Sequence, residues 1–184
     1  TPTTAEQSVH IFASKAFGNQ KSKDKFESLI EHYLGNPKSP MRNDHTYLLF
    51  IKDIIASPCI DDVEKERWTF KYKQTNKNLP GNTAIDFKWK DEKGMGHQLN
   101  EYKNQKVILY FYDPDCENCH KITAWLNKQT IPEDIQLLRI HADDKISDLY
   151  SLRAMPTIYL LDKNNKVILK DCSPELLISE INKK

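Results

Sequence analysis

The sequence lacks the features that mark a disulfide-stapled scaffold or a membrane-spanning protein. Its 184 residues include only four cysteines, too few to staple a chain of this length in the manner of small secreted domains. No apolar run is long enough to span a bilayer, and the printed residues contain no signal-peptide pattern. A targeting segment can lie outside these residues, so its absence leaves the compartment open.

Net charge is also nearly absent. The chain carries 27 Lys and Arg residues against 26 Asp and Glu residues, which gives a formal net charge of +1. Without a basic excess there is no electrostatic basis for binding nucleic acid, and we expect no nucleic-acid partner. The sequence contains no glycine-rich phosphate loop, no G-x-S-x-G motif and no H-E-x-x-H motif, and we expect no cofactor.

The most informative motif is Cys116-Glu-Asn-Cys119-His120, which follows the apolar run Val107–Tyr112. Two cysteines at this spacing, after a strand and at the start of a helix, are typical of a dithiol redox site. The histidine leaves a second interpretation open, because C-x-x-C-H is also the attachment motif of c-type haem. Zinc is the weakest candidate, since a structural site needs four ligands and there is no second close cysteine pair; we expect no metal site.

The other two cysteines, Cys59 and Cys172, stand alone in the sequence. Each is expected to be a small buried apolar residue. They could also pair with each other, but the sequence does not establish whether their Cα atoms approach within disulfide range.

Residues 1–78 are predicted to form a small all-helical domain, because apolar residues recur at helical spacing in four segments. Gly35-Asn-Pro37 ends the second helix, Asn43 or Asp44 can cap the third, and the fourth is predicted from Asp61 to Tyr72. We expect the apolar stripes to be core faces; a partner-binding groove is the alternative. The stripes comprise Ala5, Val9, Phe12, Ala13 and Ala16; Phe26, Leu29, Ile30, Tyr33 and Leu34; Tyr47, Leu48, Ile51, Ile54 and Ile55; and Val63, Trp68 and Phe70.

Residues 79–184 show the pattern of short strands instead. The continuous apolar run Val107–Tyr112 predicts a strand covered on both faces, and a helix should follow from Cys116 to Asn127. The closing helix has a marked start, with Ser173 as its cap and Pro174 in its first turn. The other predicted elements are a joint at 78–82, strands at 85–90, 135–140, 157–161 and 166–169, a hairpin turn at 93–96 and a short helix at 146–152.

Residues 79–184 resemble the thioredoxin fold, particularly the extracytoplasmic TlpA/ResA-like branch of thiol–disulfide oxidoreductases. The landmarks appear in the family's order: an opening strand at Pro80–Phe87, a central strand at Lys106–Tyr112, the dithiol, and a cis-proline segment at Tyr150–Thr157. The resemblance implies an α/β fold with a central mixed sheet flanked by helices.

Residues 1–78 resemble a helical domain of unknown function that precedes thioredoxin-like domains in some exported bacterial proteins. The stretch Asn36–Asn43 and the joint at Leu79–Gly81 carry this likeness. It supplies no chemistry, and it implies two domains, 1–78 and 79–184.

The dithiol segment suggests distinct roles for its two cysteines. Cys116, at a helix N-terminus that favours the thiolate, is the expected nucleophile. Cys119 is expected to be more buried and to resolve the mixed disulfide. The family resemblance implies a cis peptide bond between Met155 and Pro156, which would expose the Met155 backbone to a substrate strand.

Neighbouring residues are expected to tune the site. Asp113, Asp115 and Glu117 place negative charge around the nucleophile, and like charge disfavours a thiolate. A protonated His120 would act in the opposite direction. The acidic neighbours predict a reducing pair, nearer the roughly −270 mV of thioredoxin than the roughly −120 mV of DsbA. If these carboxylates point into solvent, screening reduces the effect.

Three positions depart from the thioredoxin pattern. Asp115 stands where the family often has Trp, Asn118 where it often has Pro, and Tyr110 where a buried Asp or Asn is common. The potential and the proton-shuttling residue therefore do not carry over from the family.

The resemblance implies a thiol–disulfide oxidoreductase that reduces protein disulfides outside the cytoplasm, in the periplasm or cell envelope. The chain could be anchored there through a segment outside the printed residues. Its partners would be protein disulfides and an electron-donor thiol protein, which could be membrane-bound. The alternatives are a disulfide oxidase or isomerase, a non-catalytic binding module on a thioredoxin-like scaffold, and a c-type haem protein.

Overall fold

The computed structural model describes residues 3–37 and 39–183 and divides into two compact units, Thr1–Asn76 and Lys77–Lys184. The first unit is helical, and the second is built on a mixed β-sheet. Within the described residues, no helix is long and apolar enough to cross a bilayer.

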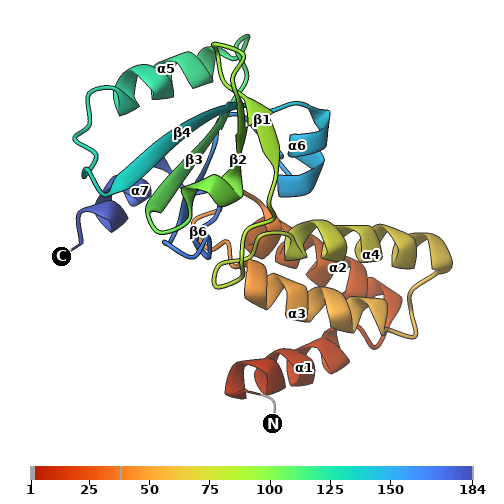
Figure 1. Ribbon diagram of the computed structural model, residues 1–184. Helices are drawn as coiled ribbons and strands as arrows, with labels where there is room; N and C mark the ends of the chain where they lie inside the picture. The colour runs from red at the N-terminus through yellow and green to blue at the C-terminus, as the bar shows by residue number, and fades with distance from the viewer. Residues whose placement is uncertain (1–2, 38, 184) are drawn as a thin grey trace. The chain divides into compact units, whose positions relative to one another are not determined.

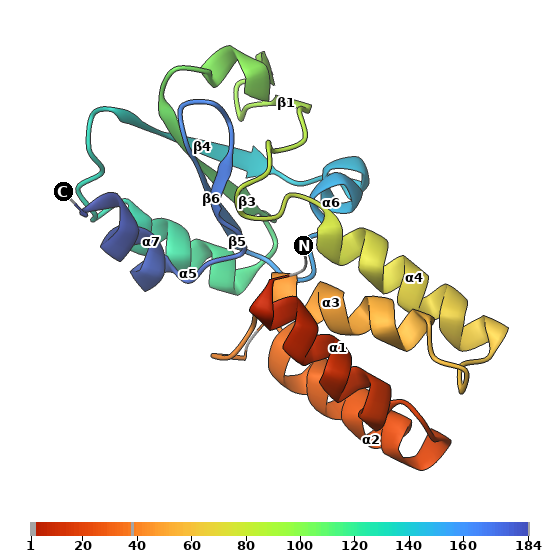
Figure 2. The ribbon, with the colours of Figure 1, turned by 90° about the horizontal axis from the view of Figure 1, so that it is seen from below.

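Four α-helices make up the described part of the first unit (Figure 2). The second of these helices continues into a short π-helical turn. Thr3, Asn19 and Asn43 each cap a helix by accepting a hydrogen bond from a backbone N–H of its first turn. Of the two caps expected for the third helix, Asn43 is the one that caps it. The helices are α1 (Thr4–Ala16), α2 (Gln20–Ile30) with its continuation η1 (Glu31–Gly35), α3 (Asp44–Ile55) and α4 (Asp62–Asn76).

Helix α3 packs against both α1 and α4 and supplies the centre of the helical core. Its residues Tyr47, Ile51 and Ile54 are buried together with Trp68 of α4. Gly35 passes so close to the Tyr47 ring that a Cβ atom there would lie 2.6 Å from Cζ. The predicted core face of the third helix is confirmed.

The fourth helix differs from its prediction in length and in orientation. It ends at Asn76 rather than Tyr72, and Trp68 is fully buried while Val63 and Phe70 are 77% and 60% exposed. At 3.6 residues per turn, side chains two and five positions from Trp68 project to roughly the opposite side of the helix. The three residues therefore cannot share one core face. Other expected core residues that are exposed are Ala5, Phe12, Leu29 and Tyr33.

The second unit is organised around a four-stranded sheet with the strand order β4-β3-β5-β6. Strands β3, β4 and β6 of this sheet are labelled in Figure 1. Strand β3 is parallel to β4 and antiparallel to β5, and β6 is antiparallel to β5. A separate antiparallel pair is formed by β1 and β2. The strands are β1 (Lys88–Lys90), β2 (Gly96–Gln98), β3 (Lys106–Tyr112), β4 (Ile135–His141), β5 (Thr157–Leu161) and β6 (Val167–Leu169).

Helices cover both faces of the four-stranded sheet. Alternate residues of β3 point to opposite faces, so that Tyr110 lies in the core formed with α5 and α7, while Leu109 lies in the core formed with α6. Because both faces are covered, β3 is buried from Val107 to Phe111, as its apolar sequence predicts. The predicted α/β fold, preceded by a helical region, is confirmed. The helical elements are η2 (Leu99–Tyr102), α5 (Glu117–Leu126), α6 (Asp144–Tyr150) and α7 (Pro174–Ile181).

The predicted opening strand is largely wrong. Only Lys88–Lys90 forms a strand, and Pro80–Phe87 contributes one isolated bridge to the residue before β6. The backbone N–H of Ile85 donates to the side chain of Asn78 at 2.8 Å. Because the N–H of Ile85 is already satisfied by a side chain, it does not need a carbonyl from a neighbouring strand.

Candidate active site

Cys116 lies at the start of α5, where it is the N-cap residue. Its Sγ atom accepts a hydrogen bond from the backbone N–H of Cys119 at 3.2 Å. The backbone N–H of Cys116 donates to the carbonyl of Asp113 at 3.1 Å, which closes the preceding loop. A thiolate here faces N–H groups and the positive end of the helix dipole, and both favour the charged form.

The two cysteines of the motif differ in exposure. Cys116 is half-buried, whereas Cys119 is 1% exposed. Burial raises the pKa of the Cys119 thiol to about 11, and a hydrogen bond with the Cys116 side chain also raises it. Both residues are free thiols. Cys116 is therefore the sulfur that an external disulfide can reach, and Cys119 keeps its proton at neutral pH.

Met155 and Pro156 lie directly beside the exposed sulfur. The peptide bond between them is cis, and the Cys116 Sγ atom is 3.7 Å from the Met155 carbonyl oxygen. Both residues are half-buried and precede β5, the strand that pairs with β3. The structure thus brings Cys116, Cys119 and Met155 together at one end of the sheet.

Tyr110 lies beneath the dithiol, and the sequence marked it only as a departure from the family pattern. Its hydroxyl donates to the carbonyl of Cys119 at 2.9 Å and shares a hydrogen bond with Thr123 Oγ1, also at 2.9 Å. Burial raises the pKa of the Tyr110 phenol. A buried tyrosine hydroxyl needs a hydrogen-bond partner. A tyrosine inside the apolar strand that precedes the dithiol is therefore the sequence feature that could have identified Tyr110 as part of the site.

The expected tuning residues lie on the exposed side of α5 and of the loop before it. Asp115, Glu117, Asn118 and His120 are all exposed. Glu117 forms an ion pair with Lys121 at 2.7 Å, so its charge is partly balanced by a neighbour. Across the part of the chain that the structure describes, none of these four side chains makes a hydrogen bond or ion pair with a cysteine sulfur.

The geometry does not favour the haem interpretation. Covalent attachment would need access to both sulfur atoms, and Cys119, in the first turn of α5, is buried. For metals in general, residues 3–37 and 39–183 contain no group of three or more His, Cys, Asp or Glu side chains that could hold an ion.

Cys59 and Cys172 belong to different units and are both free thiols. Each is half-buried rather than fully buried as expected. Cys172 packs against the core between the sheet, α5 and α7, and burial raises its pKa to about 12. A reactive role for Cys172 is not favoured, because a buried thiol with a raised pKa is inert.

Two known families match different parts of the chain. Residues 80–168 match the AhpC/TSA family, and residues 1–78 match a domain of unknown function, DUF5106. Two relatives, from Geobacillus thermodenitrificans and Geobacillus kaustophilus, are each named thiol-disulfide oxidoreductase ResA. Each is 24% identical over 47% of this chain, and the match spans 66% of the relative, just under two thirds of its length.

Solved structures with a similar fold come from Bacteroides species. A thioredoxin-like protein from Bacteroides caccae is 24% identical, with a TM-score of 0.87 over 97% of this chain and 76% of that protein. The C-terminal domain of an uncharacterized Bacteroides fragilis protein is 22% identical, with a TM-score of 0.53 over 58% of this chain and 99% of that domain. At these identities the similarity shows the fold.

Proposed function

We propose that the second unit, which is similar to the AhpC/TSA family over residues 80–168, is a thiol–disulfide oxidoreductase that reduces protein disulfides outside the cytoplasm. The observation that carries the proposal is the position of the Cys116 sulfur. It lies at the start of α5, 3.2 Å from the backbone nitrogen of Cys119 and 3.7 Å from the carbonyl oxygen of Met155. This position supports a nucleophilic role for Cys116, because a peptide that approaches the Met155 backbone would meet this sulfur.

The reaction moves two electrons from the dithiol to the substrate. The Cys116 thiolate attacks one sulfur of a substrate disulfide, a mixed disulfide forms, and the other substrate sulfur leaves as a thiolate that takes up a proton. The Cys119 thiol then loses its proton and attacks Cys116 Sγ. The second substrate sulfur leaves, so that the substrate ends as a dithiol and the protein ends with a Cys116–Cys119 disulfide.

Met155 would hold the substrate during this exchange. Its backbone borders the nucleophilic sulfur, and an extended peptide that pairs with such a backbone gains main-chain hydrogen bonds. Pro156 has no N–H to donate, which leaves the backbone groups of Met155 as the natural pairing site.

We assign the reducing direction from the electrostatics of the pair. The main support is the burial of Cys119, which raises the pKa of its thiol. Asp113, Asp115 and Glu117 add negative charge near the nucleophile, but all three are exposed and Glu117 is paired with Lys121, so their effect is small. Weak thiolate stabilisation makes the dithiol a better reductant. The oxidised protein would then need an electron-donor thiol protein outside the cytoplasm, which could be membrane-bound.

Redox equilibration in graded thiol buffers tests the proposal, with free thiols alkylated and counted by mass. We expect a reversible two-electron transition that is lost in Cys116→Ser and Cys119→Ser. The matched control Cys59→Ser should keep the wild-type midpoint. A midpoint near that of DsbA would instead indicate an oxidase or isomerase. If no transition occurs and biological activity survives in Cys116→Ser, the domain is a binding scaffold; a Soret band would indicate haem.

A further inference from the structure

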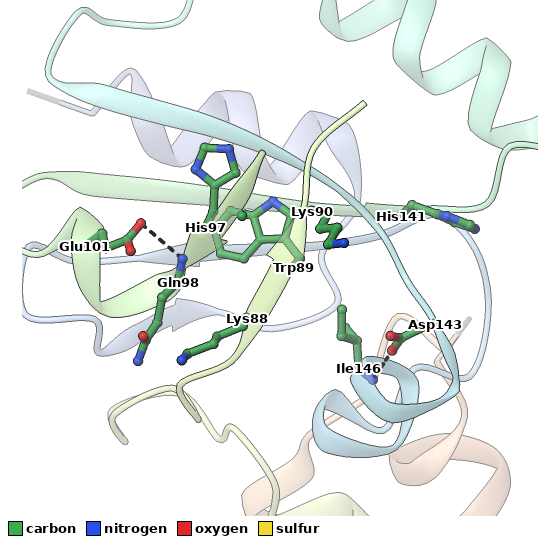
Figure 3. A pocket seen from close by; sticks show the side chains of 10 residues that line it. Lys88, Trp89, Lys90, His97, Gln98, Glu101, His141, Asp143 and Ile146 are labelled. Atoms are coloured by element: carbon green, nitrogen blue, oxygen red, sulfur yellow. Dashed lines mark hydrogen bonds between the residues drawn. The ribbon is translucent and has the colours of Figure 1, made fainter. Parts of the chain in front are cut away.

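Helix α6 leads into the segment that carries Met155. The helix has only seven residues, and an isolated helix of that length is not stable in water, so contacts with the rest of the second unit fix its position. At its start, the Asp143 side chain accepts a hydrogen bond from the N–H of Ile146 at 2.7 Å. Figure 3 shows this bond, on the wall of a pocket that β1 also lines. The other end of α6 is held by residues from outside the helix.

Two side chains of residues 77–85, the stretch that follows α4, contact the last turn of α6. The Asn78 Nδ2 atom donates to the carbonyl of Leu149 at 3.1 Å, and its Oδ1 atom accepts the backbone N–H of Ile85 at 2.8 Å. Lys77 Nζ donates to the carbonyl of Asp148 at 2.6 Å. Since the last carbonyls of a helix have no partner within it, these two side chains complete the end of α6.

Asn78 is the buried and fixed member of this pair. It is 4% exposed, and both ends of its amide have a partner. Its backbone lies in the left-handed region, with a φ of 49°, which Asn and Gly adopt more readily than other residues. The ion pair of Lys77 reaches an Asp148 carboxylate that is 70% exposed, and an exposed pair contributes little. Asn78 is therefore the side chain of this stretch that holds the end of α6 most firmly.

Tyr150, the last residue of α6, makes the same connection in the opposite direction. Its hydroxyl donates to the carbonyl of Ile85 at 2.7 Å, and its own carbonyl accepts the Tyr159 hydroxyl at 3.2 Å. Ile85 is thus bound through its N–H to Asn78 and through its carbonyl to Tyr150. The last turn of α6 is held between residues 77–85 on one side and β5 on the other.

A short segment carries this position to the backbone beside the dithiol. Ser151, with a φ of 51°, ends α6, and both Leu152 and Met155 pack against the core on this face of the sheet. Thr157 Oγ1 donates to the carbonyl of Ala154 at 2.7 Å and holds the far end of the segment. Because the segment is short, a shift in the last turn of α6 displaces the Met155 carbonyl from its place 3.7 Å from the nucleophilic sulfur.

We propose that Asn78 is a positioning residue for thiol–disulfide exchange. It holds the last turn of α6, and through that turn it holds the Met155 backbone where a substrate peptide can pair beside Cys116. This inference rests on the proposed function, because it concerns the substrate site of the same reaction. Polypeptide disulfides, which pair through their main chain, depend on Asn78, whereas a small disulfide without a main chain does not.

The first test measures the position of the segment without any thiol chemistry. Asn78→Gly suits the left-handed backbone and removes both side-chain hydrogen bonds. Hydrogen exchange of the full chain is followed by mass spectrometry. We expect residues 149–157 to exchange about fivefold to tenfold faster than in wild type, since a buried hydrogen bond that holds them is lost. Residues 135–141 of β4 should exchange as in wild type. Unchanged exchange of residues 149–157 would overturn the proposal.

Ser173→Ala is the matched control. Ser173 caps α7, which packs on the other face of the sheet, and loss of a cap destabilises a protein to a similar extent. Exchange of residues 149–157 should stay at the wild-type rate in this variant. Equal acceleration in both variants would show a general loss of stability and would overturn the proposal.

A second variant identifies the hydrogen bond that matters. At pH 8, Asn78→Asp keeps an acceptor for the N–H of Ile85 but has no N–H to donate to the carbonyl of Leu149. Residues 149–157 should therefore exchange as fast as in Asn78→Gly. Exchange at the wild-type rate would show that α6 does not depend on this bond, and the proposal would fail.

The second test connects Asn78 to catalysis. Reduced protein is mixed with a disulfide-containing peptide or with hydroxyethyl disulfide, and its oxidation is followed by quenched-flow alkylation. In Asn78→Gly, the half-saturating peptide concentration should rise about fivefold to tenfold while the limiting rate stays within about twofold, as expected when binding alone is weakened. The rate with hydroxyethyl disulfide should stay within about twofold, and Ser173→Ala should match wild type with both disulfides.

The outcomes separate this inference from the proposed function. An unchanged half-saturating concentration in Asn78→Gly, or an equal loss with both disulfides, would overturn the role of Asn78 while exchange by wild type stands. If wild type reduces neither disulfide but Asn78→Gly accelerates hydrogen exchange in residues 149–157, the proposed function is wrong and the connection from Asn78 to Met155 stands.

Discussion

The Tyr110 hydroxyl donates a hydrogen bond to the carbonyl oxygen of Cys119 at 2.9 Å, and Thr123 Oγ1 lies at the same distance from that hydroxyl. This relationship joins the buried centre of β3 to the first turns of α5. The N–H of Cys119 is the group that contacts the Cys116 sulfur. Tyr110 is therefore a positioning residue, which acts on the nucleophile through the backbone of Cys119.

Tyr110→Phe should loosen this arrangement with little change of shape. We expect a loss of about 1–2 kcal/mol in the free energy of unfolding, since a buried hydrogen bond is removed. Resolution of the mixed disulfide should slow about threefold to tenfold, or roughly 0.7–1.4 kcal/mol in activation free energy. Urea unfolding and stopped-flow exchange measure the two effects.

Tyr159→Phe is the matched control for this experiment. Tyr159 is also buried in the sheet, and its hydroxyl donates to the carbonyl of Tyr150 at 3.2 Å, away from α5. It should lose similar stability at an unchanged exchange rate. If Tyr110→Phe likewise leaves exchange unchanged, its role is structural only.

The raised pKa of Cys119 predicts a stability that falls in alkaline solution. Its folded-state pKa is about 11 against an ordinary value of 9.0, chiefly through burial. Below pH 9 the Cys119 thiol is neutral in both the folded and the unfolded protein, and the free energy of unfolding is not reduced by its titration. Between pH 9 and 11 the unfolded chain loses this proton while the folded protein keeps it, so the free energy of unfolding decreases.

A pKa difference of two units corresponds to a loss of at most about 3 kcal/mol in the free energy of unfolding. This loss is measured by urea unfolding at pH 8, 9, 10 and 11. Wild type should lose stability more steeply over this range than Cys119→Ala, which lacks the titrating group. Parallel curves for the two proteins would show that the Cys119 thiol is not shifted by folding.

Gly35→Ala tests the close approach in the helical unit. A Cβ atom at this position would lie 2.6 Å from Cζ of the buried Tyr47 ring, and an extra methyl group in a tight core costs roughly 1–3 kcal/mol. Gly18→Ala is the control, because its Cβ would meet no atom closer than 3.4 Å. Thermal unfolding should show a lower Tm for Gly35→Ala alone; equal Tm values for both variants would mean that the ring moves aside at no cost.

The sequence predicts most of the features that depend on residues close to one another in the chain. The covered strand at Val107–Tyr112, the caps Asn43 and Ser173, and the helix that begins after Cys116 all follow from local patterns and lie where expected. Each depends on hydrophobic periodicity or on one side chain that satisfies nearby N–H groups, so no knowledge of distant contacts is needed.

The rest depends on which segments meet in space. The bond from Tyr110 to Cys119 exists only because α5 lies across β3, and the pocket exists because β1 lies near the start of α6. The exposure of Phe70 could not be foreseen either, because an apolar residue does not reveal which side of its helix is covered. Hydrophobic periodicity assigns each residue to one side of a helix. When apolar residues occur on more than one side, it does not say which side is buried.

Lys23 is the clearest case of a residue that sequence reasoning would leave in solvent. Its side chain is 0% exposed, and its Nζ atom lies 2.7 Å from Glu64 of α4 and 3.5 Å from the buried Glu27. Burial raises the pKa of Glu27, and the nearby Lys23 charge opposes that effect. The lysine is tolerated in the core only because carboxylates from two helices surround it.

Lys23→Met should therefore destabilise the helical unit by up to about 3–5 kcal/mol, because Glu27 is left as a buried charge with only the more distant Arg67 guanidinium, at 3.8 Å, to offset it. The double variant K23M/E27L should recover most of this loss, since a buried ion pair replaced by apolar residues is often neutral. Lys21→Met, an exposed lysine on the same helix, controls for the loss of charge and should change little. Urea unfolding of wild type, Lys23→Met, Glu27→Leu and the double variant gives the coupling energy between Lys23 and Glu27. A double variant no more stable than Lys23→Met would show that the pair is not the cause.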